Sequence, residues 1–176
     1  MLKIAIVGPE STGKSELSIA LASHFGGNYV PEFARTYVEK LDRNYLYEDV
    51  VFIAQKQIEE QDLYNNNNNI LNPSSIVFFD TELIITKVWL EFCYKSVPKF
   101  INERISNKYF DLYLLCYPDL PWVFDPVREH GGSERLFFFD WYKREIEKIG
   151  IPYVIIDGIG TIRTKKAIAA VNKIIK

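Results

Sequence analysis

The stretch Gly8-Pro9-Glu10-Ser11-Thr12-Gly13-Lys14-Ser15 matches the pattern G-x-x-x-x-G-K-[ST] of a phosphate-binding loop. An apolar run at residues 2–7 lies immediately before it and is typical of a buried strand. After it, Leu17, Leu21 and Phe25 recur at the spacing of a helix. The alternative is a glycine-rich turn that only looks like the pattern, but a strand before and a helix after are the context that a true phosphate loop requires.

Each position of the loop has a chemical reason. Glycines let backbone N–H groups approach phosphate oxygens, and the start of the following helix adds the positive end of its dipole. Lys14 supplies a mobile charge for the β- and γ-phosphates, and the Ser15 hydroxyl can bind Mg²⁺. The predicted ATP-binding residues are Gly8, Glu10, Ser11, Thr12, Gly13, Lys14 and Ser15.

The composition is that of one globular domain, which we assign to residues 1–176. The net charge is −2 and there is no basic tail, which argues against nucleic acid as a partner. No apolar run approaches the roughly 18 residues of a membrane helix. Cys93 and Cys116 lie far apart and outside any C-x-x-C pattern, so we expect reduced core cysteines in a cytoplasmic protein.

Apolar runs alternate with helical patterns along the rest of the chain. The runs predict further strands at residues 28–30, 76–79, 112–116 and 153–156. Helical spacing predicts a helix that includes residues 50–61 and others over 81–95, 137–149 and 162–175. Strands that alternate with helices indicate right-handed crossovers. The expected fold class is therefore α/β, with a mostly parallel five-stranded sheet covered on both faces.

Acidic residues follow three of these strands, where ligands of open α/β sheets bind. Asp80 ends one strand and is expected to hold Mg²⁺ opposite Ser15, directly or through water; the alternative is an N-cap for the next helix. Glu32 is expected to accept a hydroxyl proton, and the alternative is a helix-start charge. The roles of Glu32 and Asp80 could also be exchanged. Asp157 is the third such residue.

A segment with two arginines, residues 121–136, lies between the fourth expected strand and a helix. Arg128 and Arg135 flank a glycine pair, which suits a lid that brings guanidinium groups to the transferring charge. The alternative is a solvated loop with ordinary surface arginines. Trp122 either belongs to the core or stacks on a ligand ring, and the sequence favours neither. Trp89 is expected in a helix core.

Four motifs follow one another along the chain. They are Glu10-Ser11-Thr12-Gly13-Lys14-Ser15, Val30-Pro31-Glu32-Phe33-Ala34-Arg35, Asp80-Thr81-Glu82 with Thr86-Lys87-Val88-Trp89, and Pro118-Asp119-Leu120-Pro121-Trp122-Val123 with Arg128. Together they resemble the ribosylnicotinamide kinase domain of the NadR family, in order and spacing, over nearly the whole chain. Glu82 departs from the family pattern, which often has aspartate there.

The resemblance implies a three-layer P-loop fold like that of nucleoside and nucleotide kinases, and phosphorylation of nicotinamide riboside by ATP with Mg²⁺. The implied catalytic residues are Lys14, Glu32, Asp80, Arg128 and Arg135, and the implied acceptor site consists of Glu32, Arg35, Trp122 and Asp125. Residues 157–163 occupy the position at which related kinases hold adenine; the alternative is a plain strand-to-helix turn.

Two other functions stay open: a kinase for another nucleoside or small metabolite, and a regulatory P-loop ATPase. The sequence leans against the ATPase, because many such proteins have adjacent aspartate and glutamate after the third strand, and here Thr81 separates them. The oligomeric state is not indicated by the sequence.

Overall fold

The computed structural model describes residues 1–65, 76–124 and 132–175. At its centre lies a five-stranded sheet with the order β2-β3-β1-β4-β5, and every neighbouring pair of strands is parallel. The strands are β1 (Leu2–Val7), β2 (Asn28–Val30), β3 (Ile76–Asp80), β4 (Leu112–Cys116) and β5 (Tyr153–Ile156). The predicted parallel sheet is confirmed, and β3 extends one residue further, to Asp80.

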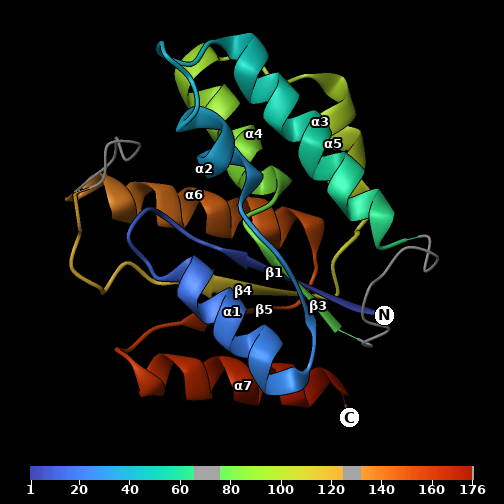
Figure 1. Ribbon diagram of the computed structural model, residues 1–176, viewed down its shortest axis with the longest axis vertical. Coiled ribbons are helices and arrows are strands. Elements are labelled where there is room, and N and C mark those ends of the chain that lie inside the picture. Colours follow the sequence, from blue (N-terminus) through green and yellow to red (C-terminus); the bar gives the residue numbers. More distant parts are fainter. Residues whose placement is uncertain (66–75, 125–131, 176) are drawn as a thin grey trace.

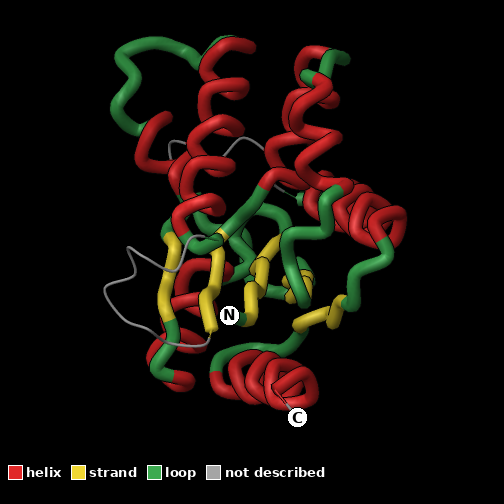
Figure 2. The backbone as a smooth tube through the Cα atoms, turned by 90° about the vertical axis from the view of Figure 1, so that its right-hand side faces the viewer, coloured by secondary structure: helices red, strands yellow, loops and turns green. Residues whose placement is uncertain are grey.

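Helices cover both faces of this sheet (Figure 1). On one face lie α1 (Lys14–Phe25) and α7 (Thr161–Ile175), which contact each other. On the other face lies α6 (Glu134–Ile149), packed against α4 (Leu83–Tyr94). Beyond α4, the helices α2 (Phe33–Val38), α3 (Tyr47–Leu63) and α5 (Lys99–Ser106) complete the second helical layer. Figure 2 shows the three layers edge-on, with the sheet in the middle.

The central strands β1, β3 and β4 are largely apolar because both of their faces are covered by helices. In β1, Ile4 and Ile6 pack on the face of α1 and α7, whereas Ala5 and Val7 pack on the opposite face. Every residue of β3 and β4 is buried. A third apolar cluster joins α3, α4 and α5, and Ile101 anchors the short α5 within it.

Several local expectations need correction. The helix expected from residue 137 begins at Glu134, and the helix expected from residue 81 begins at Leu83. Neither α2 nor α5 was predicted, because six and eight residues are too few for a clear helical pattern. Cys116 is buried as expected, but Cys93 is exposed on α4 and is not a core residue.

The strand order brings the expected site residues together. Because β3 lies between β1 and β2, the loop after β1, the end of β3 and the residues after β2 share one edge of the sheet. Ile6 pairs with Asp80 across β1 and β3, and Val30 pairs with Phe79 across β2 and β3.

Among the helices of the described ranges, none is long and apolar enough to cross a membrane.

Candidate active site

The loop between β1 and α1 has a backbone that demands glycine. Gly8 has φ +150°, and a Cβ there would lie 2.7 Å from the carbonyl oxygen of Cys116, closer than real contacts allow. Gly13 has φ +71° and forms the N-cap of α1. Ser11, between them, also has a left-handed backbone, with φ +53°. The two glycines of the motif are therefore required by the loop's shape.

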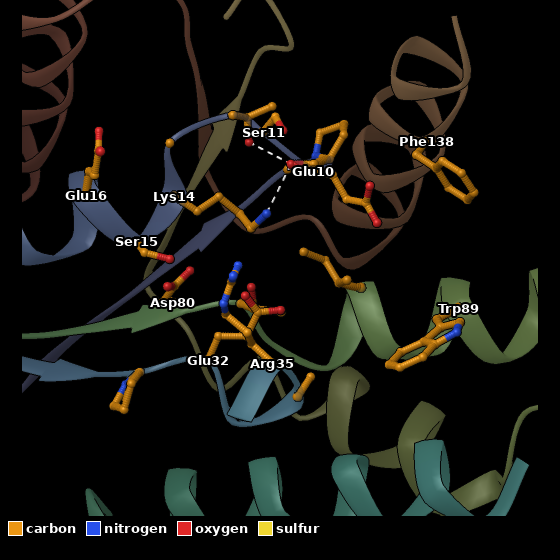
Figure 3. A pocket seen from close by; sticks show the side chains of 18 of the residues that line it. Glu10, Ser11, Lys14, Ser15, Glu16, Glu32, Arg35, Asp80, Trp89 and Phe138 are labelled. Carbon is orange, nitrogen blue, oxygen red and sulfur yellow. Dashed lines mark hydrogen bonds between the residues drawn. The ribbon is translucent and has the colours of Figure 1, made fainter. Parts of the chain in front are cut away.

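The loop folds around the carbonyl oxygen of Pro9. The Thr12 hydroxyl donates to this oxygen at 2.8 Å, and the Lys14 ammonium donates to it at 3.0 Å (Figure 3). Thr12 is buried, whereas Lys14 and Ser15, in the first turn of α1, face a cavity. Lys14 thus already lies over the loop at which phosphates are expected.

The cavity has a volume of about 860 Å³ and opens along the carboxyl edge of the sheet. Its walls come from the phosphate loop, the residues after β2, the end of β3, one face of α4, the segment after β4 and the first turns of α6. This volume lies within the range of small-molecule sites. Glu10, Glu32, Arg35 and Asp80 all line it, and Figure 3 shows these side chains around one space.

Asp80 presents a carboxylate oxygen that the protein does not satisfy. The side chain is only 2% exposed, and its Oδ2 accepts a hydrogen bond from Tyr29 at 3.5 Å. Within the described part of the chain, its Oδ1 is buried without a hydrogen-bond partner. A buried carboxylate oxygen in that state calls for a ligand, and a cation or its water beside Ser15 would fit there.

The backbone directly after Asp80 has an unusual conformation. Thr81 has φ +72°, which is rare for a β-branched residue, and its N–H donates to the carbonyl oxygen of Ile6 at 3.0 Å. The alternative role of Asp80 as an N-cap is wrong: the N-cap of α4 is Glu82, whose side chain accepts from the N–H of Ile84 at 2.9 Å.

No group of three or more histidine, cysteine, aspartate or glutamate side chains gathers as a metal site in residues 1–65, 76–124 and 132–175. Mg²⁺ does not require one, since it keeps several waters and takes one or two protein ligands plus substrate phosphates. The unsatisfied Asp80 and the Ser15 hydroxyl fit such an ion.

Glu32 lies where α2 begins, but its side chain makes no capping hydrogen bond. It therefore occupies the helix-start position of the alternative, and it also lines the cavity. Burial raises the pKa of Glu32 above its ordinary value, and Asp80 acts in the same direction while Lys14 opposes it. A carboxylate with a raised pKa is a better proton acceptor near neutral pH. Arg35, one turn further on, also lines the cavity and pairs with Glu39 at 2.9 Å.

Mostly aromatic side chains form the far wall of the cavity. Ile85, Trp89 and Phe92 come from one face of α4, and Phe138 and Tyr142 come from α6. Trp89 lines the cavity and also packs, partly buried, against the apolar cluster of α3, α4 and α5, so its expected place in a helix core is confirmed in part. The ring of Tyr45, from the loop before α3, meets Trp89 edge-to-face at 4.7 Å between centroids. The sequence reasoning missed this wall, although the i, i+4, i+7 spacing of its α4 residues could have indicated it.

The segment before α6 differs from the expected lid. Arg135 is only 8% exposed and bonds to backbone carbonyls, so it does not face a closing lid as expected. Trp122 packs near Phe124 and does not line the cavity, whereas its neighbours Pro121 and Val123 do. Asp125 and Arg128 lie outside the described residues.

The turn after β5 is held by a buried arginine. Arg163 donates to Asp119 at 2.7 Å and to the carbonyl oxygens of Gly158 and Tyr117 at 2.8 and 2.7 Å. Asp119 also accepts from the N–H of Gly158 at 2.6 Å. Although burial acts to raise it, these hydrogen bonds lower the pKa of Asp119. Asp157 pairs with Lys166 at 2.6 Å and does not line the cavity.

Comparison with known proteins agrees with this geometry. The family described as an AAA domain matches residues 3–164. The trifunctional NAD biosynthesis/regulator protein NadR of Salmonella typhimurium is 30% identical over 140 residues, which cover 74% of this chain and 32% of that protein. The chain therefore spans about a third of the length of this relative.

Two solved structures are similar over nearly the whole chain. A crystal structure of NadR in complex with NR has a TM-score of 0.73 at 27% identity and covers 98% of this chain and 51% of the other. A crystal structure of NadR with NAD and AMP-PNP has a TM-score of 0.71 at 26% identity and covers 98% and 49%. The fold seen here is thus that of a nucleotide-binding P-loop domain.

Proposed function

The chain belongs to the AAA domain family of P-loop proteins and has NadR proteins among its relatives, and from this premise we propose that it is a kinase that phosphorylates nicotinamide riboside with ATP. The observation that carries the proposal is one cavity that joins a phosphate loop, two carboxylates and an aromatic wall. The proposed unit is a single kinase domain, residues 1–176.

The donor binds along the loop from Gly8 to Ser15. Backbone N–H groups of the loop and the N-terminal end of α1 meet the phosphates, and Lys14 turns from the carbonyl of Pro9 to the β- and γ-phosphates. Ser15 and Asp80 would hold Mg²⁺, which would neutralise developing charge on the phosphates. The similarity to NadR with AMP-PNP supports a triphosphate donor.

The acceptor lies between Glu32 and the aromatic wall. A flat ring fits against Trp89 and Tyr45, because aromatic faces and edges bind planar rings well. Acidic side chains of the cavity, Glu10, Glu32 and Asp80, suit the positive charge of a nicotinamide ring. NadR solved with NR is the relative that supports this choice of acceptor.

The reaction moves one phosphoryl group and one proton. The 5′-hydroxyl oxygen of the riboside forms a bond to the γ-phosphorus, and the bond from that phosphorus to the bridging β–γ oxygen breaks. Glu32 accepts the hydroxyl proton, which its raised pKa favours, and ADP leaves with the bridging oxygen. Catalysis rests mainly on positioning and charge stabilisation, and Lys14, a cation of the loop that lines the cavity, would supply part of that charge.

The test is ADP release from ATP and Mg²⁺ with and without nicotinamide riboside, with the product identified by mass. We expect ADP release by the wild type to depend strongly on the riboside. In Trp89→Leu we expect the KM for the riboside to rise while the KM for ATP stays nearly constant. Trp122→Leu is the matched control, since Trp122 does not line the cavity. Equal ADP release without any nucleoside would favour a regulatory ATPase, and preference within a nucleoside panel for another member would change the acceptor.

A further inference from the structure

Arg135 occupies a position that is unfavourable for a cation. It lies in the first turn of α6, where the helix dipole favours negative charge, and it is only 8% exposed. Burying a guanidinium costs free energy unless hydrogen bonds compensate for lost water. The placement of Arg135 is therefore explained by what it binds and not by the stability of α6.

The guanidinium group joins two separate segments of the chain. Its Nη2 donates to the carbonyl oxygens of Pro118 and Leu120, at 2.9 and 2.8 Å, in the segment after β4. Its Nη1 donates to the carbonyl oxygen of Ser11 at 3.3 Å, in the phosphate loop. A planar fork with several fixed donors can hold three carbonyls at once, and a lysine ammonium lacks that geometry.

Ser11 is the residue at which these contacts converge. Its backbone is left-handed, with φ +53°, so the loop's shape at this residue needs outside support. Its Oγ lies 3.2 Å from the nitrogen and 3.4 Å from the oxygen of Val123. Both the carbonyl and the hydroxyl of Ser11 are thus fixed to the 118–123 segment or to the arginine that holds it.

Leu120 adds a packing contact to the same junction. A Cβ on Gly13 would lie 3.2 Å from Leu120 Cδ1, so this side chain packs directly against the helix-side end of the loop. Arg135 donates to the carbonyl oxygen of Leu120, and the Leu120 side chain in turn packs against the loop at Gly13. The arginine therefore supports the loop at two points, the carbonyl of Ser11 and the contact at Gly13.

We propose that Arg135 is a positioning residue that holds the phosphate loop in its nucleotide-binding shape by tying Ser11 to the segment after β4. The inference rests on the proposed binding of a nucleotide at this loop. Arg135 acts through backbone carbonyls, so its loss disorders the loop before the nucleotide arrives. Binding must then meet the cost of ordering the loop, which weakens nucleotide affinity and leaves the acceptor wall unaffected.

The experiment measures the affinity of Mg²⁺·AMP-PNP by calorimetry in the wild type, Arg135→Lys and Arg135→Met. Arg135→Lys keeps the buried charge but loses the fork, and it serves if the methionine variant fails to fold. We expect both variants to bind AMP-PNP roughly tenfold or more weakly, with KM for ATP raised in parallel and KM for the acceptor within about threefold of the wild type.

The matched control is Arg104→Met. Arg104 is also largely buried, and it bonds to Gln61 and Asp62 in the last turn of α3, away from the phosphate loop. This variant should lower the melting temperature without changing AMP-PNP affinity. A lowered melting temperature with unchanged AMP-PNP affinity in Arg135→Lys would overturn the proposal, because the arginine would then support only the fold. A fall in kcat at unchanged AMP-PNP affinity would also overturn it, since Arg135 would then meet the phosphoryl group itself.

The same data separate this inference from the proposed function. A wild type that binds AMP-PNP but does not phosphorylate nicotinamide riboside refutes the acceptor assignment and leaves the calorimetric test of Arg135 intact. A wild type that does not bind AMP-PNP refutes both.

Discussion

Glu82 should make the protein less stable as the pH rises through neutrality. Its side chain is only 2% exposed and caps α4 directly after the Asp80–Thr81 turn of the site. Burial raises the pKa of Glu82 from 4.5 to about 8, although hydrogen bonds from the backbone of Ile84 and Leu83 act to lower it. At neutral pH the carboxyl is therefore protonated in the folded protein and ionised in the unfolded chain.

The sign and size follow from proton linkage. Between pH 4.5 and about 8 the folded state holds one more proton at Glu82 than the unfolded state, so the free energy of unfolding falls as pH rises. The slope reaches about 1.4 kcal/mol per pH unit, and the whole interval corresponds to a ceiling of roughly 5 kcal/mol. Below pH 4.5 both states are protonated and this contribution no longer changes.

The assay is urea unfolding at pH 5.5, 6.5 and 7.5 for the wild type and Glu82→Gln. Glutamine keeps an oxygen that can accept from Ile84 but cannot ionise, so the variant should lose most of the downward slope and be the more stable protein at pH 7.5. Subtracting the variant from the wild type removes other groups such as Glu32, whose pKa is also raised. Glu103→Gln, at a side chain 59% exposed, should follow the wild type. Parallel slopes for wild type and Glu82→Gln would refute the reasoning, because Glu82 would then be ionised in the folded state.

Three further predictions concern the site itself. Lys14→Ala should lower turnover by roughly 10²–10³ with an unchanged circular dichroism spectrum, because a single charge donor is lost from a preformed loop; turnover near the wild-type value in a folded variant would contradict the kinase proposal. Asp80→Asn should raise the Mg²⁺ concentration needed for half-maximal activity, whereas Glu32→Gln should keep ATP affinity and lower turnover by roughly 10²–10⁴. If added Mg²⁺ restored the activity of Glu32→Gln but did not change that of Asp80→Asn, the two roles would have to be exchanged. Gly8→Ala should abolish AMP-PNP binding in calorimetry, because its Cβ meets the Cys116 carbonyl at 2.7 Å; normal affinity would show that the loop tolerates another shape.

Local patterns in the sequence were enough for much of the fold. Four of the strands have the bounds expected from the sequence, because the mostly apolar residues of a covered sheet contrast with the glycine-, proline- and aspartate-containing turns beside them. The phosphate loop was equally clear, since glycine at positions 8 and 13 meets a backbone requirement that acts within a few residues. The expected place of Asp80 at the end of a strand is confirmed, and the sheet order puts this strand beside β1. The short α2 and α5 were not predicted because six and eight residues give too little helical pattern, and α5 is held by packing of Ile101 in the third apolar cluster.

What only the tertiary structure decided is which side chains meet. The helical spacing of Ile85, Trp89 and Phe92 gives them a common face of α4, but only the packing of the other segments shows that this face borders a cavity. In the sequence Arg135 looks like a surface cation. Once α6 and the segment after β4 pack together, its guanidinium is buried and donates to three backbone carbonyl oxygens. Glu82 likewise has its pKa set by burial. Hydrophobic period and turn chemistry act between near neighbours in the chain and can be read from the sequence. Burial and charge environment are set by segments 100 or more residues apart, such as Ser11 and Arg135, and exist only once the chain has folded.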